Sequence, residues 1–69
     1  MTLSAPVTLE ELEQGNLFAY KGTFALKTEY RTEKGVIEAY IVGSGEFFWG
    51  GTTTPEEQAK LMVVPVNIH

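Results

Sequence analysis

The fold of this chain is decided by the stretch Val36-Ile37-Glu38-Ala39-Tyr40-Ile41-Val42-Gly43-Ser44-Gly45-Glu46-Phe47-Phe48-Trp49. Two runs rich in β-branched and aromatic residues, separated by Gly-Ser-Gly, are typical of two strands joined by a turn. Apolar side chains fall on both faces of this strand pair, whereas a sheet with one solvated face alternates apolar and polar residues. We therefore expect the second face to be covered by another part of the chain or by another molecule.

Turn signals divide the rest of the chain into further short strands and one helix. Strands are expected over residues 16–20, 23–32, 36–42, 46–49 and 61–68. Thr54-Pro55-Glu56-Glu57 has the form of a capping box, which predicts a helix from Pro55 to about Lys60. Thr8-Leu9-Glu10-Glu11 has the same form and predicts one or two helical turns, and Pro65 suggests a sheet edge or a bulge. The pattern predicts an all-β fold: a small antiparallel meander curling into an SH3-like roll or a partly open five-stranded barrel, closed by the last strand.

The turns also predict which side chains share a face, because residues opposite one another in an antiparallel pair lie on the same side. Tight turns at Lys21-Gly22 and Glu33-Lys34 and a three-residue Gly-Ser-Gly loop give one consistent set of registers. The predicted inner face comprises Leu17, Ala19, Phe24, Leu26, Tyr30, Ile37, Ala39, Ile41, Phe47 and Trp49. The predicted outer face carries Phe18, Tyr20, Ala25, Tyr40, Val42 and Phe48 among charged residues such as Lys27.

The size of the chain makes a partner for the outer face plausible. A single domain of 69 residues, of which residues 1–7 are expected to form a flexible arm, buries only about 60% of the surface that its unfolded form exposes. The chain has no cysteine, so disulfides cannot compensate for the small core. Oligomerisation is the remaining common means of stabilisation.

The chemical inventory argues against catalysis, a metal or another cofactor. The only histidine is the terminal residue His69, and the chain lacks both cysteine and aspartate. A Ser/His/Asp or Cys/His arrangement therefore cannot form within one chain. The first residues resemble neither a signal peptide nor a membrane span, so we expect a cytoplasmic protein without membrane contacts.

Two functions are consistent with these features. The first is a noncatalytic protein-interaction module, expected to be homo-oligomeric, that meets a protein partner or a second copy through the outer face. Its expected contact residues are Phe18, Tyr20, Tyr40, Val42 and Phe48. The alternative is a single-stranded nucleic-acid-binding β-barrel that stacks bases on Tyr20, Tyr40 and Phe48 above a small cluster of Lys27 and Arg31. The net charge of −4 and the interleaved glutamates weigh against nucleic acid.

Several strings of the middle half of the chain resemble a known group of proteins. They are Gly15-Asn16-Leu17-Phe18, Ala25-Leu26-Lys27-Thr28-Glu29-Tyr30, Ala39-Tyr40-Ile41-Val42-Gly43-Ser44-Gly45-Glu46 and Phe48-Trp49-Gly50-Gly51. Together they resemble small uncharacterised proteins of tailed phages and enterobacterial prophages. The resemblance implies a small accessory protein in the cytoplasm of a bacterial host, acting on host or phage proteins, and it transfers no catalytic or binding residue.

Overall fold

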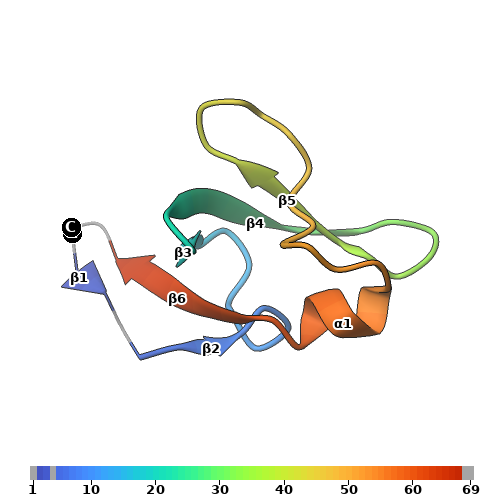
Figure 1. Cartoon of the computed structure of the whole chain (residues 1–69), viewed down its shortest axis with the longest axis horizontal. Coiled ribbons are helices and arrows are strands. Elements are labelled where there is room, and N and C mark those ends of the chain that lie inside the picture. Colours follow the sequence, from blue (N-terminus) through green and yellow to red (C-terminus); the bar gives the residue numbers. More distant parts are fainter. Residues whose placement is uncertain (1, 4, 68–69) are drawn as a thin grey trace.

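The computed structural model describes residues 2–3 and 5–67 and consists of one antiparallel sheet and one short helix (Figure 1). The elements are β1 (Thr2–Leu3), β2 (Val7–Thr8), β3 (Leu17–Tyr20), β4 (Thr23–Arg31), β5 (Ile37–Ile41), α1 (Pro55–Ala59) and β6 (Met62–Asn67). The strand order is β1-β6-β3-β4-β5, and β2 also pairs with β6. The predicted all-β class is confirmed. The last strand does not close the sheet, because β6 pairs with β3 and with the N-terminal strands rather than with β5.

The N-terminal residues are part of the sheet, so the prediction of a flexible arm over residues 1–7 is wrong for the described part of that segment. Thr2 and Leu3 pair with Asn67 and Val66, and Val7 pairs with Val63. The pairing partner of β6 thus changes from β2 to β1 across Val64 and Pro65. A proline is tolerated there because a strand can omit a ladder hydrogen bond where its partner is interrupted. His69 lies outside the described residues.

Both predicted capping boxes form, but only one of them begins a helix. The Thr54 hydroxyl accepts a hydrogen bond from the Glu57 N–H (3.2 Å), and Pro55 occupies the first turn of α1, as predicted. The hydroxyl and N–H of Thr53 donate to the Glu57 carboxylate and, together with Thr54, hold the pKa of Glu57 below its ordinary value.

The Thr8 box stabilises a single turn of helical type, within the one or two turns that were predicted. The Glu11 N–H donates to the Thr8 hydroxyl (3.1 Å), and that hydroxyl donates to the Glu11 carboxylate (2.8 Å). The chain then leaves the helical path after one turn, which Leu12 closes with a hydrogen bond from its N–H to the Thr8 carbonyl (3.1 Å).

The β3–β4 hairpin has the predicted register. Leu17 lies opposite Leu26 and Ala19 opposite Phe24. The turn residues Lys21 (φ 46°) and Gly22 (φ 80°) both adopt positive φ. Two successive positive φ angles define the two-residue turn that matches the twist of the flanking strands.

The β4–β5 register differs from the prediction because the turn contains three residues instead of two. The Thr32 N–H donates to the Val36 carbonyl (2.9 Å), so Glu33, Lys34 and Gly35 form the loop, with Gly35 at φ 85°. Side chains alternate between the faces of a strand, so one additional loop residue moves every side chain of the preceding strand to the other face. The side chains of β3 and β4 therefore point to the faces opposite to those predicted.

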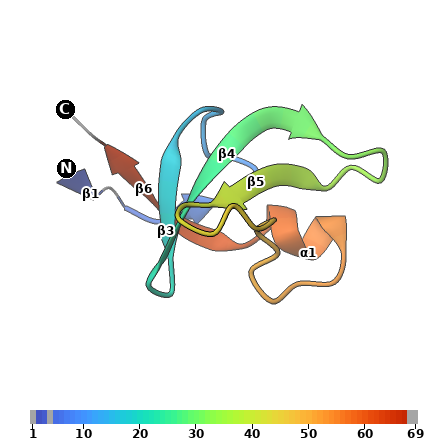
Figure 2. The same cartoon turned by 90° about the horizontal axis from the view of Figure 1, so that it is seen from above.

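A β-bulge interrupts the same strand pair farther along. Lys27 lies opposite Ala39 and Arg31 opposite Ile37, so β4 has two more residues than β5 between these pairs. The Thr28 side chain replaces the missing ladder bonds: its hydroxyl donates to the Glu38 carbonyl (2.6 Å) and accepts from the Tyr30 N–H (3.2 Å). Bulges increase local twist, and β4 and β5 form a strongly twisted pair that extends past β3 (Figure 2).

The segment after β5 also has a different register from the predicted one. Phe47 lies opposite Tyr40 in an isolated bridge, and the Ile41 N–H donates to the Glu46 carbonyl (2.8 Å). The loop therefore contains four residues, 42–45, rather than the predicted three. This second change of one residue turns Phe48 toward the core and Trp49 away from it, the opposite of the prediction.

The core consequently lies on the side of β3 and β4 that the sequence analysis assigned to the outer face. Phe18 is fully buried and Phe48 is 3% exposed, so the prediction that both face outward is wrong. The largest part of the core is a cluster of Leu9, Leu12, Phe18, Ala25, Ile37, Ala39, Phe48 and Val63. Only β5 was assigned correctly, with Ile37 and Ala39 buried.

A buried lysine lies on the side of β4 that faces the core. Lys27 is 5% exposed, and its ammonium donates to the carbonyl oxygens of Leu9 (2.8 Å), Glu10 (3.1 Å) and Leu12. The capped turn after Thr8 directs these carbonyls at the sheet. A buried ammonium is tolerated when all of its hydrogen-bond donors have acceptors. The three hydrogen bonds of Lys27 hold the Thr8 turn against β4.

A buried glutamine similarly joins α1 to the edge of the sheet. The Gln58 side chain is fully buried; its oxygen accepts from the Ile37 N–H (2.9 Å), and its Nε2 donates to the carbonyls of Ile37 (3.0 Å) and Phe48 (3.1 Å). The amide thus occupies backbone positions that a further strand would otherwise pair with.

Replacing Gln58 by leucine should therefore be costly. Leucine retains the volume but leaves one buried N–H and two buried carbonyls without partners, so we expect a loss of about 2 to 3 kcal/mol in the free energy of unfolding. Urea unfolding followed by circular dichroism measures the loss. Gln14→Leu, at an exposed position, is the control. Equal stability of the two variants would contradict the role assigned to Gln58.

The Gly50-Gly51 pair forms a bend, and its two members differ in surroundings. Both have positive φ (63° and 79°), but a Cβ on Gly50 would collide with Leu61 and lie 3.0 Å from the Phe48 ring, whereas one on Gly51 would have no neighbour within 4 Å. No lysine-serine pair follows these glycines, as a phosphate loop would require, and the structure uses them to turn the chain.

The two alanine variants of this pair should separate packing from backbone strain. Gly51→Ala carries only the strain of positive φ, about 1 kcal/mol. Gly50→Ala adds overpacking, and we expect a total loss of about 2 to 4 kcal/mol. Thermal or urea unfolding of both variants measures the difference, and equal losses would contradict close packing around Gly50.

Candidate functional site

The five predicted partner-binding residues do not lie on one surface. Phe18 and Phe48 are core residues whose rings meet edge to face at 5.0 Å between centroids. Tyr20 is half-buried, packs edge to face on Phe48 (5.6 Å), and its hydroxyl donates to the Gly50 carbonyl (3.4 Å). Only Tyr40 and Val42 are exposed, at 38% and 58%.

Tyr40 and Val42 belong to a continuous apolar surface on the side of the sheet opposite the core. Phe24 lies opposite Ala19, and the Val42 N–H donates to the Phe24 carbonyl (2.8 Å), which places Val42 beside Phe24. Leu26 lies opposite Tyr40. Together with the segment after β5, these residues form what we call the aromatic face: Phe24, Leu26, Tyr40, Val42, Phe47 and Trp49.

Three rings form a row along this face. The Tyr40 and Phe47 centroids are 5.8 Å apart with planes at 83°, and the Phe47 and Trp49 centroids are 5.2 Å apart with planes at 42°. Both spacings fall in the range of attractive aromatic contacts. Phe47 is half-buried within the row, and Trp49 remains 42% exposed. The ring contacts therefore hold the row in one arrangement, and part of the Trp49 and Tyr40 side chains remains exposed for contact with a partner.

One polar interaction borders the row. The Tyr40 hydroxyl donates to the Glu38 carboxylate (2.9 Å), and this hydrogen bond raises the pKa of Tyr40 above its ordinary value. The bond fixes the direction of the Tyr40 ring, because it ties the outer end of the side chain to its own strand.

A groove of about 500 Å³ adjoins the row at the β4–β5 turn. Its lining combines residues of the β4–β5 turn with apolar side chains: Thr32, Glu33, Lys34, Val36, Phe47 and Trp49. The groove extends the apolar surface toward a rim that carries one charge of each sign.

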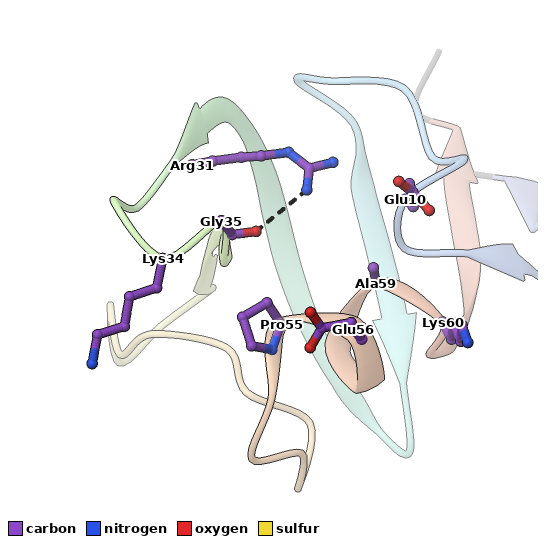
Figure 3. A pocket seen from close by; sticks show the side chains of 8 residues that line it. All are labelled: Glu10, Arg31, Lys34, Gly35, Pro55, Glu56, Ala59 and Lys60. Carbon is purple, nitrogen blue, oxygen red and sulfur yellow. Dashed lines mark hydrogen bonds between the residues drawn. The ribbon is translucent and has the colours of Figure 1, made fainter.

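A second, smaller groove lies between the β4–β5 turn, α1 and the turn after β2 (Figure 3). Its volume is about 270 Å³, and its lining is Glu10, Arg31, Lys34, Gly35, Pro55, Glu56, Ala59 and Lys60. The Arg31 guanidinium donates to the Gly35 carbonyl (3.3 Å). Since three cations and two anions are mixed in its lining, this groove offers no field of one sign for an ionic ligand.

The residues proposed for nucleic-acid binding are mostly engaged elsewhere. Lys27 is buried under the Thr8 turn, where burial, and secondarily the charge of Arg31, lower its pKa below the ordinary 10.5. Tyr20 and Phe48 pack against one another in the core. Of the predicted stacking rings and cations, Tyr40 and Arg31 remain exposed.

Two further properties concern the described part of the chain alone. Within residues 2–3 and 5–67, no three side chains of His, Cys, Asp or Glu gather as metal ligands would. The helical residues described include no segment with the length and apolar character of a membrane span.

Comparisons of the chain with models of protein families, with curated proteins and with solved structures found no match. The kind of partner that the aromatic face can bind is therefore inferred from the chemistry of its side chains.

Proposed function

We propose that this protein is a noncatalytic protein-interaction module whose contact surface is the aromatic face. The observation that supports the proposal is the gathering of Phe24, Tyr40 and Trp49, each about two fifths exposed, around one sheet face. Contiguous exposed apolar patches on small proteins mark contact sites, whereas single exposed apolar residues need no explanation.

The ordered aromatic row favours recognition of a protein surface. Tyrosine and tryptophan carry large apolar area at a low cost in side-chain entropy, and they are enriched among the residues that dominate binding energy. The Tyr40–Glu38 hydrogen bond and the ring contacts of Phe47 hold the row in one arrangement before a partner arrives. A preordered surface loses less entropy on association.

The resemblance to phage and prophage proteins supports a proposal about where this protein acts. We propose an accessory protein that acts in the cytoplasm of a bacterial host, and this part rests on the resemblance alone.

Affinity isolation with variants of the aromatic face tests the proposal. The bait is the whole chain, either unchanged or carrying Phe24→Ser and Trp49→Ser together. Lys60→Ser is the control, because Lys60 is exposed and lines the second groove, which contains no residue of the aromatic face. We expect the unchanged chain and the control to retain the same protein, whether a host or phage protein or an untagged copy of this chain, and the double variant to lose it. Retention by all three baits would overturn the proposal, provided circular dichroism shows that the double variant is folded.

A further inference from the structure

We infer that the aromatic face is occupied by a second copy of this chain, packed face to face in a symmetric dimer. This inference rests on the proposed function, because it names the partner of the same surface. Three observations favour a second copy over an unrelated partner: the charge of the face, its area and the state of the adjoining sheet edge.

The six residues of the aromatic face carry no charge, and one carboxylate, that of Glu38, borders them. In a two-fold symmetric contact each surface meets itself, so a face with charges of one sign would repel its copy. The six uncharged residues bring no such penalty, and the single carboxylate at their border already accepts the Tyr40 hydrogen bond, although the whole chain carries a net charge of −4.

The area of the face matches the apolar part of a standard interface. An aromatic side chain presents roughly 150 to 250 Å², so exposures of 42%, 42% and 38% leave roughly 60 to 100 Å² on each of Phe24, Trp49 and Tyr40. With Leu26 (39%) and Val42 (58%), the exposed total reaches roughly 300 to 500 Å². A standard interface buries about 800 Å² per partner, of which somewhat more than half, about 450 Å², is apolar.

The edge of β5 is closed, so a copy cannot associate by adding a strand there. The Phe48 N–H donates to the Ala39 carbonyl (2.8 Å), the Ile41 N–H donates to the Glu46 carbonyl, and the Gln58 amide pairs with Ile37. An exposed strand edge would offer free backbone groups to a second chain. With these groups occupied, the route left to the copy on this side of the molecule is to stack its sheet on the aromatic face, as paired sheets do in sandwiches.

The small core gives such a dimer a physical benefit. Among the residues whose burial the structure describes, 5–66, the five largest fully buried side chains are Phe18, Leu9, Ile37, Gln58 and Val63, and one of them is polar. A second copy would bury additional apolar area that a chain of 69 residues cannot cover by itself. Association with the folded form also stabilises that form by mass action.

Trp49 provides the measurement, since it is the only tryptophan of the chain and lies within the proposed interface. The test follows Trp49 fluorescence and sedimentation equilibrium of the purified chain from low micromolar to millimolar concentration. We expect the mass to double with concentration and the Trp49 emission to shift to shorter wavelength in parallel. Phe24→Ser should abolish both changes, and Lys60→Ser should preserve both.

A chain that stays monomeric over this range, with an emission independent of concentration, would overturn the second copy as the partner. The proposed function would survive that result if affinity isolation still retained another protein in a manner dependent on Phe24 and Trp49, and would fail with it otherwise. A dimer whose formation leaves the Trp49 emission unchanged and tolerates Phe24→Ser would use another surface and would also overturn the inference.

Discussion

Replacing Phe48 by alanine is expected to lower the free energy of unfolding by about 3 to 5 kcal/mol. The Phe48 ring is 3% exposed and contacts Phe18 and Tyr20 edge to face, so truncation leaves a cavity between two further aromatic rings. A domain of this length has a total stability of about 3 to 10 kcal/mol. The loss therefore amounts to between about a third and all of this stability, so the variant should unfold at a much lower urea concentration than the wild type, and without urea if the total lies near the lower bound.

Trp49→Ala is the matched control for Phe48→Ala, because the two residues are adjacent aromatics on opposite faces. Trp49 is 42% exposed and contacts Phe47 on the aromatic face. Its removal should leave the fold intact, with a loss of about 1 kcal/mol. Circular dichroism during urea unfolding measures both variants. Unfolding by Trp49→Ala and tolerance of Phe48→Ala would show that the register after β5 is the one expected from the sequence.

Lys27→Met is expected to lower the free energy of unfolding by about 3 to 5 kcal/mol, as much as the loss of a core aromatic ring. Methionine fills a similar volume but cannot donate to the carbonyls of Leu9, Glu10 and Leu12. Removing both partners of a buried polar contact can be neutral, but here the acceptors stay and lose their donor. The Thr8 turn should detach from β4 as a result.

Lys34→Met is the control for Lys27→Met, because Lys34 is an exposed lysine in the β4–β5 loop. Urea unfolding should show little change for Lys34→Met. Equal stability of the two variants would contradict the buried ammonium. The same pair separates the effect of losing a positive charge, which is common to both, from the effect of losing the three hydrogen bonds.

The stabilising contribution of Lys27 should also depend on pH. The folded chain holds the pKa of Lys27 below 10.5, chiefly through burial and then through the charge of Arg31, while Glu10 opposes this shift. Between the lowered pKa and 10.5 the unfolded chain binds more protons than the folded one, so this contribution rises with pH through that interval. The difference in urea midpoint between the wild type and Lys27→Met should therefore widen as the pH approaches 10.5.

The strands, the helix and one tight turn of this fold were predictable, because each depends on a short stretch of sequence. The all-β class follows from runs of β-branched and aromatic residues between turn signals. The helix at Pro55–Ala59 follows from its capping box, and the β3–β4 register follows from the two-residue turn at Lys21-Gly22. Each of these depends on contacts between residues near in sequence.

The presence of an exposed apolar face was predictable from the sequence, but most of the residues that form it were not. An apolar second face was expected, and the structure has one, but it is formed largely by Phe24, Leu26, Phe47 and Trp49, which were assigned to the core. Tyr40 and Val42 were placed correctly because β5 kept its predicted side. Gly35 was the available signal, since glycine at the third position of a three-residue turn supplies the positive φ that such a turn requires.

The sequence by itself determined the strands, the turns and the presence of apolar side chains on both faces of the sheet. The tertiary structure alone decided which face became the core, because a change of one residue in a loop moves a whole strand's side chains across the sheet at little local cost. That choice places Lys27 inside, where three carbonyls of a distant turn accept hydrogen bonds from its ammonium. A pattern based on hydrophobicity places a lysine outside, and the partners that make it acceptable inside are brought together only by the fold.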